Sequence, residues 1–360
     1  MTRSLLPRFD LGNRPVGDGA PCFITFEAGP THDGLDTALK LVTLAAEAGA
    51  DAIKFQVLDP DRLVADKTMA FSYDVLVDRA TGATETVTEP LYDILCRRVM
   101  THDEWRRVKA HADGLGLAFF ATALFDDEID LLAELGCHSV KIASGDVNHW
   151  PLIRRAARTG MSLQLDTGNA SLGEIESAVD VALEDGCDRI IIHQCPSGYP
   201  ARLESINLRI IPTLARLFAC PVAYSDHTPG WEMDVAAVAL GANMVEKTIT
   251  LDRQTRSCEH MFSLEPTDMA AFVRVIREVE TALGAPRRIL HAEERRRRRN
   301  VRRSAWLVDG GRRGDRLGDL AVDFRRPGDG VGPDLFEQLA DARLAVDVPA
   351  GHRLSVGDLG

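Results

Sequence analysis

The sequence predicts an α/β protein whose main part, residues 20–285, folds as a (β/α)8 barrel, also called a TIM barrel. Short apolar runs alternate with amphipathic stretches eight times in this range, which is the pattern of parallel strands joined by helices. The range spans about 265 residues, the usual length of such a barrel. No glycine-rich dinucleotide-binding turn follows the first run, and this disfavours a doubly wound open sheet.

Each predicted strand is a short apolar run that ends in polar or turn-forming residues. We expect strands at residues 23–29, 52–57, 117–124, 139–144, 161–167, 189–195, 222–228 and 244–250. Helical spacing of apolar residues predicts helices at residues 35–48, 102–115, 126–135, 150–159, 171–184, 207–218, 231–240 and 265–283. Residues 59–100 are long and irregular, and we expect an excursion over the strand ends.

The bulk composition is that of an ordinary globular protein. The chain has 360 residues, 45% of them hydrophobic and 27% charged, which is enough apolar material for a large core. A net charge of −12 argues against nucleic-acid binding. We find no apolar run of membrane-spanning length and no signal-peptide core at the start. The seven scattered cysteines form no Cys-x-x-Cys pair, so we expect a cytoplasmic protein without structural zinc.

The composition changes after Gly284, so we divide the chain into a barrel domain at 1–285, a basic linker at 286–303 and a small β-rich domain at 304–360. The linker contains five consecutive arginines at 295–299. A solvated linker is a commoner cause of such a run than a nucleic-acid or targeting signal. The last domain is too small to be very stable without packing on a neighbour.

The stretch 222–231 is the most informative part of the chain. Strand alternation places Ser225 and His227 on one face, and Tyr224 and Asp226 on the other. A hydroxyl and an imidazole together suit an oxyanion and a divalent metal, although a strand end with a satisfied histidine is the plain alternative. Other predicted strand ends are equally polar: they carry Glu27, Lys54, Gln56, Lys141, Ser144, Asp146, Asp166, His193 and Glu246.

Two lysines near these strand ends require counter-charges, because an unpaired buried ammonium is costly. Glu27 or Asp146 could neutralise Lys54 and Lys141 for purely structural reasons. Alternatively, the lysines form a cradle for a phosphate and a carboxylate, with hydroxyl donors added by Ser144 and Ser225.

The remaining groups suggest how such a site would react. His227 would hold a divalent metal that polarises a carbonyl oxygen. Asp146 is placed two residues beyond Ser144 to act as a base or to align a water. Together the residues favour metal-assisted carbon–carbon chemistry on a small phosphorylated acid.

Several motifs, taken in order, resemble those of the sialic acid synthase family, which includes the pseudaminic and legionaminic acid synthases. They lie at residues 27–29, 32–34, 49–56, 140–145, 198–200, 224–228 and 263–266. Residues 302–304 and 325–330 resemble the family's antifreeze-like (SAF) domain. The resemblance extends over residues 23–360 and implies a barrel with that small domain, in a domain-swapped homodimer.

The resemblance also implies an activity and roles for individual residues. The family joins phosphoenolpyruvate to an amino-sugar aldehyde and releases phosphate. By similarity, Lys54, Lys141, Ser144 and Ser225 would bind phosphoenolpyruvate, and His227 would bind the metal. Glu27, Gln56, Tyr199 and Glu259 fall where the sugar would be contacted, and Arg326 falls where the small domain reaches it.

Four positions depart from the family pattern. Thr248 replaces a second metal-binding histidine, so His193, Glu246 and His260 become candidate helpers for His227. Asp146 replaces a catalytic glutamate, and Asp166 replaces a serine near the expected phosphate. The loop before Tyr199 is one residue longer and lacks the usual asparagine.

These departures leave three outcomes open for the metal. Water could replace the lost imidazole, which would leave a weak Mn²⁺ or Mg²⁺ site on His227. Another side chain could step in. Without a metal, Lys247 or a protonated His227 could polarise the aldehyde. We favour the weak site.

Three functions are compatible with these residues. The first is a metal-dependent, carbon–carbon bond-forming transferase that condenses phosphoenolpyruvate with an acylamino aldose to give a nonulosonic (sialic-acid-like) 2-keto-3-deoxy acid. The second is a divergent enzyme that uses another aldehyde acceptor, or a related addition or cleavage without phosphoenolpyruvate. The third is a non-catalytic sugar-acid binding protein.

Overall fold

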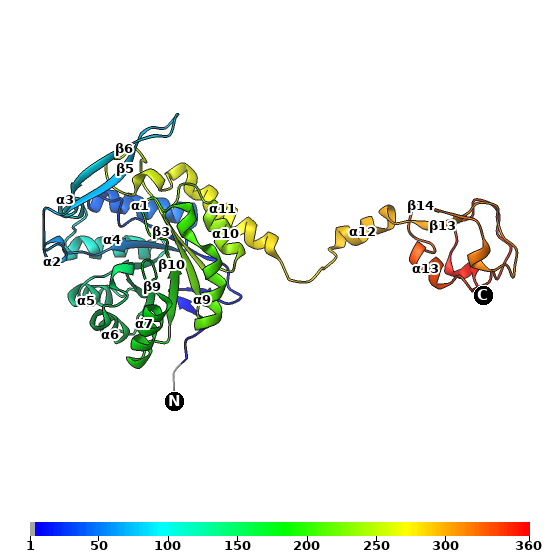
Figure 1. Cartoon of the computed structure of the whole chain (residues 1–360), viewed down its shortest axis with the longest axis horizontal. Coiled ribbons are helices and arrows are strands. Elements are labelled where there is room, and N and C mark those ends of the chain that lie inside the picture. Colours follow the sequence, from blue (N-terminus) through cyan, green and yellow to red (C-terminus); the bar gives the residue numbers. More distant parts are fainter. Residues whose placement is uncertain (1–3) are drawn as a thin grey trace. The chain divides into compact units, whose positions relative to one another are not determined.

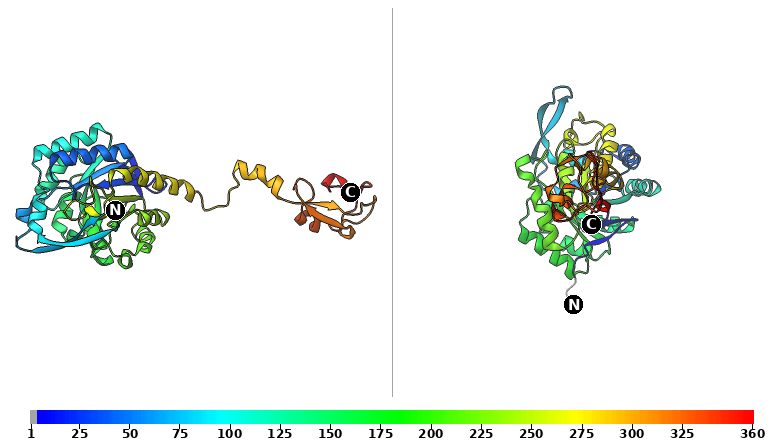
Figure 2. Two further views of the ribbon diagram at one scale, coloured as in Figure 1. Left: turned by 90° about the horizontal axis from the view of Figure 1, so that it is seen from above. Right: turned by 90° about the vertical axis from the view of Figure 1, so that its right-hand side faces the viewer.

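The computed structural model describes residues 4–360, which divide into two compact units at Gly284. In the first unit, eight parallel strands form a closed barrel surrounded by helices (Figures 1 and 2). The strands are β3 (Phe23–Glu27), β4 (Ala52–Gln56), β7 (Ala118–Thr122), β8 (Ser139–Ile142), β9 (Ser162–Asp166), β10 (Ile190–Gln194), β11 (Val222–Asp226) and β12 (Met244–Thr248). The predicted TIM barrel is confirmed.

The helices lie close to the positions expected from their apolar spacing. They are α1 (Leu35–Ala48), α4 (His102–Gly114), α5 (Asp126–Glu134), α6 (Trp150–Ala157), α7 (Leu172–Glu184), α8 (Leu203–Ile206), α9 (Ile211–Phe218), α10 (Glu232–Ala239) and α11 (Pro266–Leu283). Their apolar faces cover the barrel, so the strands are buried on both sides and read as continuous apolar runs. Among the described residues, none of the helices is long and apolar enough to cross a membrane.

A short hairpin that the sequence analysis missed closes the amino-terminal end of the barrel. It is formed by β1 (Arg8–Leu11) and β2 (Arg14–Gly17). Leu11 and Val16 are fully buried against the first residues of the barrel strands, including Phe23. Strands of four residues carry too few alternations to be recognised from the sequence.

The excursion between β4 and β7 is more regular than expected, which corrects the prediction for residues 59–100. It contains α2 (Pro60–Leu63), β5 (Ala70–Asp78), β6 (Ala83–Pro90) and α3 (Leu91–Cys96). The β5–β6 hairpin projects from the barrel (Figures 1 and 2). Arg79 fixes it to the chain after β12, with Nη2 2.6 Å from both Asp252 Oδ1 and Glu265 Oε1.

The second unit has its own small core of buried residues, formed by Ala305, Leu307, Leu317, Val331, Leu344, Val348 and Leu354. Its elements are α12 (Ala292–Val301), β13 (Ser304–Leu307), β14 (Val322–Arg325) and α13 (Pro333–Gln338). The five arginines at 295–299 lie on α12, which buries none of its residues. The expected linker is therefore partly helical.

Asp51 joins three elements at the amino-terminal end of the barrel. It is 4% exposed, and its Oδ2 accepts hydrogen bonds from Ile24 N at 2.8 Å and Arg277 Nη2 at 2.7 Å. Its other oxygen pairs with Arg14. The carboxylate thus links β3 to α11 and to the β1–β2 hairpin.

We expect Asp51→Ala to lower the free energy of unfolding by about 2–4 kcal/mol, because Arg277 and Ile24 N–H would lose their partner. Urea unfolding measures this change. The matched control is Asp103→Ala, which removes an exposed pair with Arg106 and should cost less than about 1 kcal/mol. Equal losses in the two variants would contradict the assigned role of Asp51.

Candidate active site

The polar strand ends meet in one pocket of about 240 Å³ at the carboxyl-terminal end of the barrel. Most of the residues singled out in the sequence line it. These are Glu27, Lys54, Gln56, Lys141, Ser144, Asp166, Tyr199, Ser225, His227, Glu246 and Glu259. Most of them lie in the barrel strands or directly after them, whereas Tyr199 and Glu259 come from the loops that follow β10 and β12.

The two lysines are buried and paired with carboxylates. Lys141 Nζ lies 2.7 Å from Glu246 Oε1 and 2.9 Å from Asp166 Oδ2. Lys54 Nζ contacts Glu27 and is 3.3 Å from the same Glu246 oxygen. Burial lowers the pKa of Lys141, but the two carboxylates outweigh burial and raise it above its usual value. Glu246 therefore bridges both ammonium groups.

These contacts decide between the two interpretations of the lysines only in part. Glu27 does neutralise Lys54, as the structural alternative supposes. Asp146 does not neutralise either lysine. Its Oδ1 lies 3.7 Å from His149 Nδ1, and its side chain is 29% exposed. It is also not among the residues that line the pocket. The structure gives Asp146 no contact that supports its assignment as the base.

Of the two expected hydroxyl donors, Ser225 stands beside Lys141, and Ser144 lines the same pocket. Ser225 Oγ donates to Glu246 Oε1 at 3.2 Å and lies 3.5 Å from Lys141 Nζ. Ser144 begins a 3-10 turn, Ser144–Asp146, directly after β8. A Cβ at Gly168 would lie 3.2 Å from Ser144 Cβ and 3.1 Å from a backbone oxygen, so a glycine lets this loop pass close to Ser144.

Gly29 explains the Glu-Ala-Gly motif of the first strand end. Its N–H donates to Glu27 Oε1, which orients that carboxylate. A Cβ there would lie 2.5 Å from the same oxygen and 2.8 Å from Gln56 N. Only a residue without a side chain lets the chain pass between these two pocket residues.

Only one carboxylate oxygen of Asp166, Oδ2, pairs with another side chain of the pocket, Lys141. Its Oδ1 is buried and has no hydrogen-bond partner among the described residues, and it lies 3.7 Å from His193 Nδ1, which is also unpartnered. His193 Nε2 is hydrogen-bonded to Gln164 Oε1 at 2.9 Å. Burial raises the pKa of Asp166 and lowers that of His193, so the imidazole is neutral.

His227 presents a metal-ligating group in the form that a metal requires. Its Nδ1 lies 3.3 Å from the Pro196 carbonyl, which leaves Nε2 available, and its ring packs at 4.5 Å against Tyr199. Burial lowers the pKa of His227 to about 4. Burial thus favours the neutral imidazole near pH 7, which is the form that a metal binds, over the protonated His227 considered as an alternative.

The other candidate metal ligands are less well placed. Glu246 is held by the lysines, and neither His193 nor His260 is among the residues that line the pocket. Among the described residues, no three His, Cys, Asp or Glu side chains are grouped as metal ligands. The chain thus fits a divalent ion that has one imidazole ligand, His227, and takes its other ligands from water and substrate.

Lys247 faces away from the pocket, so the prediction that it could polarise the aldehyde is wrong. Its side chain is fully buried; its ammonium contacts Asp226 and donates to the Thr228 carbonyl at 2.6 Å. Asp226 also accepts from Tyr224 OH at 2.8 Å. The Lys247–Asp226 ion pair thus joins β12 to β11 on the side of the strands that faces away from the pocket.

Several lining residues were missed by the sequence analysis, among them Phe71, Arg98 and Cys258. Phe71 and Arg98 belong to the excursion, whose regular structure was not recognised. Their sequence neighbourhood carries no motif, and only the tertiary structure brings them to the strand ends.

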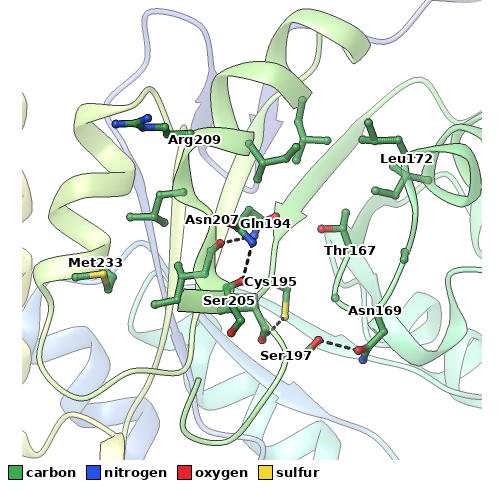
Figure 3. A pocket seen from close by; sticks show the side chains of 18 of the residues that line it. Thr167, Asn169, Leu172, Gln194, Cys195, Ser197, Ser205, Asn207, Arg209 and Met233 are labelled. Atoms are coloured by element: carbon green, nitrogen blue, oxygen red, sulfur yellow. Dashed lines mark hydrogen bonds between the residues drawn. The ribbon is translucent and has the colours of Figure 1, made fainter. Parts of the chain in front are cut away.

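A larger groove of about 970 Å³ lies behind β10, beside α7 and α8 (Figure 3). Its lining is mostly apolar, with Leu172 and Met233 at its edges and Arg209 as its single charged residue. Ser197 Oγ donates to Asn169 Oδ1 at 2.8 Å across part of it. Because this groove lacks carboxylates, lysines and imidazoles, we assign the chemistry to the smaller pocket.

Comparisons with known proteins agree with this pocket. Residues 41–288 match the model of the NeuB family. The chain is 32% identical to the N,N'-diacetyllegionaminic acid synthase of Legionella pneumophila, over 95% of this chain and 96% of that protein. It is 34% identical to the human N-acetylneuraminate-9-phosphate synthase, over 76% and 74%. The sialic acid synthetase structure from Leptospira borgpetersenii matches with a TM-score of 0.70 and 29% identity, over 82% and 96%. The chain therefore belongs to the NeuB family, the sialic acid synthase family that its motifs resemble.

Proposed function

We propose that the protein condenses phosphoenolpyruvate with an acylamino sugar aldehyde, giving a nonulosonic 2-keto-3-deoxy acid and phosphate. The observation that carries the proposal is the convergence of Lys54, Lys141, Ser144, Ser225 and His227 in one buried pocket. A pair of ammonium groups with adjacent hydroxyls suits a small molecule that bears both a phosphate and a carboxylate.

In this mechanism the two lysines give up contacts with carboxylates of the protein and bind phosphoenolpyruvate, the donor substrate, instead. Lys141 and Lys54 leave Glu246 for the phosphate and carboxylate of phosphoenolpyruvate. The electron pair of the donor's C=C bond joins its methylene carbon to the aldehyde carbon, and the aldehyde oxygen takes up a proton. A water adds to the phosphate-bearing carbon and gives up a proton, and the bond from that carbon to the phosphate oxygen then breaks, which releases phosphate and leaves a keto group. His227 is the residue that would hold a divalent ion, Mn²⁺ or Mg²⁺, whose contribution when bound is to polarise the aldehyde oxygen.

The acceptor would contact a second set of lining groups. Glu27, Gln56, Tyr199 and Glu259 offer carboxylate, amide and phenol groups for sugar hydroxyls. Tyr199 is 44% exposed, and its phenol can donate a hydrogen bond to a sugar oxygen. These groups position the aldehyde beside the donor.

One observation favours a second candidate, a divergent enzyme on the same frame. Asp166 already occupies Lys141 at 2.9 Å, where a donor phosphate would otherwise bind. An enzyme that adds to or cleaves a different keto acid would tolerate this carboxylate better than one that binds a phosphate.

A phosphate-release assay with phosphoenolpyruvate, Mn²⁺ and a panel of aldoses tests the proposal. We expect release only when an aldose is present, with a product whose mass equals aldose plus pyruvate. Lys141→Ala is the control for contaminating phosphatase. Aldose-dependent chemistry without phosphate release would favour the divergent enzyme.

We further propose that the second unit is an antifreeze-like domain whose Arg326 completes the pocket of a partner subunit in a homodimer. Arg326 is exposed, and its only hydrogen bond among the described residues goes from Nε to the Val301 carbonyl at 3.1 Å, so its guanidinium keeps free donors. We expect Arg326→Ala to raise the KM of the acceptor. If Arg326 acts across subunits, mixing Arg326→Ala with Lys141→Ala protein should give some sites with the low acceptor KM of the wild-type protein, which neither variant shows alone. A monomer in sedimentation would contradict the proposal.

A further inference from the structure

Arg98 is the one cation lining the pocket that has no carboxylate partner among the described residues. It follows α3, is 4% exposed, and its Nη2 donates to Cys258 Sγ at 2.7 Å. Lys54 and Lys141 are each paired with carboxylates in the same pocket. A thiol is a weak acceptor and does not neutralise a guanidinium. A buried charge without a direct ion-pair partner is costly, so an anion that enters the pocket would stabilise Arg98.

The charge of Arg98 shifts the pKa values of neighbouring side chains. Burial and then the charge of Arg98 lower the pKa of His32 to about 4 and that of His260 to about 4. Glu259 is the carboxyl of the pocket nearest in sequence to Cys258; burial raises its pKa, and the charge of Arg98 acts in the opposite direction. Glu259 is therefore a nearby acid, but among the described residues no carboxylate forms a direct ion pair with Arg98.

Arg98 reaches the pocket from a different part of the chain than the two lysines. The lysines come from β4 and β8 of the barrel, whereas Arg98 stands in the wall formed by the excursion, beside Phe71, Leu91 and Ile94. An apolar wall lowers the local dielectric constant, which strengthens attraction between a guanidinium and an anion. The planar guanidinium can bind a carboxylate or phosphate through two hydrogen bonds at once.

We propose that Arg98 binds an acidic group of the acceptor, a phosphate or a carboxylate, and that the acceptor is therefore an acidic aldose. The inference rests on the proposed function, because it assigns the donor to the lysines and leaves Arg98 for the second substrate. A neutral sugar would leave the guanidinium buried without a partner.

Equilibrium binding to the full-length protein tests this with matched probes: N-acetylmannosamine, its 6-phosphate and a hexuronate. We expect at least one acidic sugar to bind roughly 10- to 100-fold more tightly than the neutral one, the range of a charge-assisted hydrogen bond. Arg98→Met should abolish the preference, and Arg98→Lys should keep part of it. The control is Arg97→Met, because Arg97 is exposed and paired with Glu89, so the preference should persist.

The outcomes separate this inference from the proposed function. Equal binding of acidic and neutral sugars by the wild-type protein would overturn it, even if no variant folds. An increase in the KM of phosphoenolpyruvate, rather than of the acceptor, in Arg98→Met would also overturn it by assigning Arg98 to the donor. A retained binding preference with no phosphate release from any aldose would refute the proposed function and still support an acidic-ligand site at Arg98.

Discussion

Lys141→Ala is expected to lower kcat/KM by roughly 10³-fold or more, since it removes a charge-assisted contact to an anion in a desolvated site. The loss of kcat should persist at saturating phosphoenolpyruvate. The reason is that Lys141 is fully buried beside two carboxylates, where solvent cannot replace its contact with the bound substrate. Lys54→Ala should likewise abolish turnover. Phosphate release measured over a range of donor concentrations separates kcat from KM.

The same substitution should destabilise the protein, so a matched control is required. Removing Lys141 leaves Asp166 and Glu246 without their main partner, which should cost about 3–5 kcal/mol in the free energy of unfolding. Lys247→Ala removes another buried lysine with two nearby acids, but from outside the pocket. We expect comparable destabilisation in Lys247→Ala with nearly normal kcat per folded molecule. Wild-type kinetics in folded Lys54→Ala and Lys141→Ala would exclude the cradle.

Chelation with EDTA is expected to abolish activity, and added Mn²⁺ or Mg²⁺ should restore it. The reason is that the described residues provide a single imidazole, His227, and no cluster of three ligands, so the ion should be weakly held. His227→Gln should be inactive in the presence of either metal. Full activity in EDTA, with His227→Gln still inactive, would refute the metal site.

Thr248→His provides a gain-of-function test of the same site. Thr248 is 2% exposed and shares a strand face with Glu246, which lines the pocket. A second imidazole should tighten Mn²⁺ binding by roughly tenfold or more, because neutral imidazole is a better ligand than a hydroxyl. Calorimetric titration of Mn²⁺ measures this without relying on turnover. Unchanged affinity in a folded variant would place residue 248 outside the metal's reach.

The sequence by itself determined the barrel and most of the pocket. Eight apolar runs with helical stretches between them specify parallel strands, and strand ends meet in such a fold whatever the loops do. Strand alternation also assigned Ser225 and His227 to the pocket and Tyr224 and Asp226 to the opposite face, as the contacts show.

Only the tertiary structure decided the pairing of charges and the contribution of the excursion. Which carboxylate meets which lysine depends on distances across the barrel, so the sequence did not show that Glu246 bridges both ammonium groups, that Asp146 is absent from them or that Lys247 faces outward. The sequence did not identify Arg98 as a pocket residue for a related reason. Its partners lie far along the chain, and an arginine's lack of a carboxylate is a property of the folded pocket, where burial makes an unpaired charge costly.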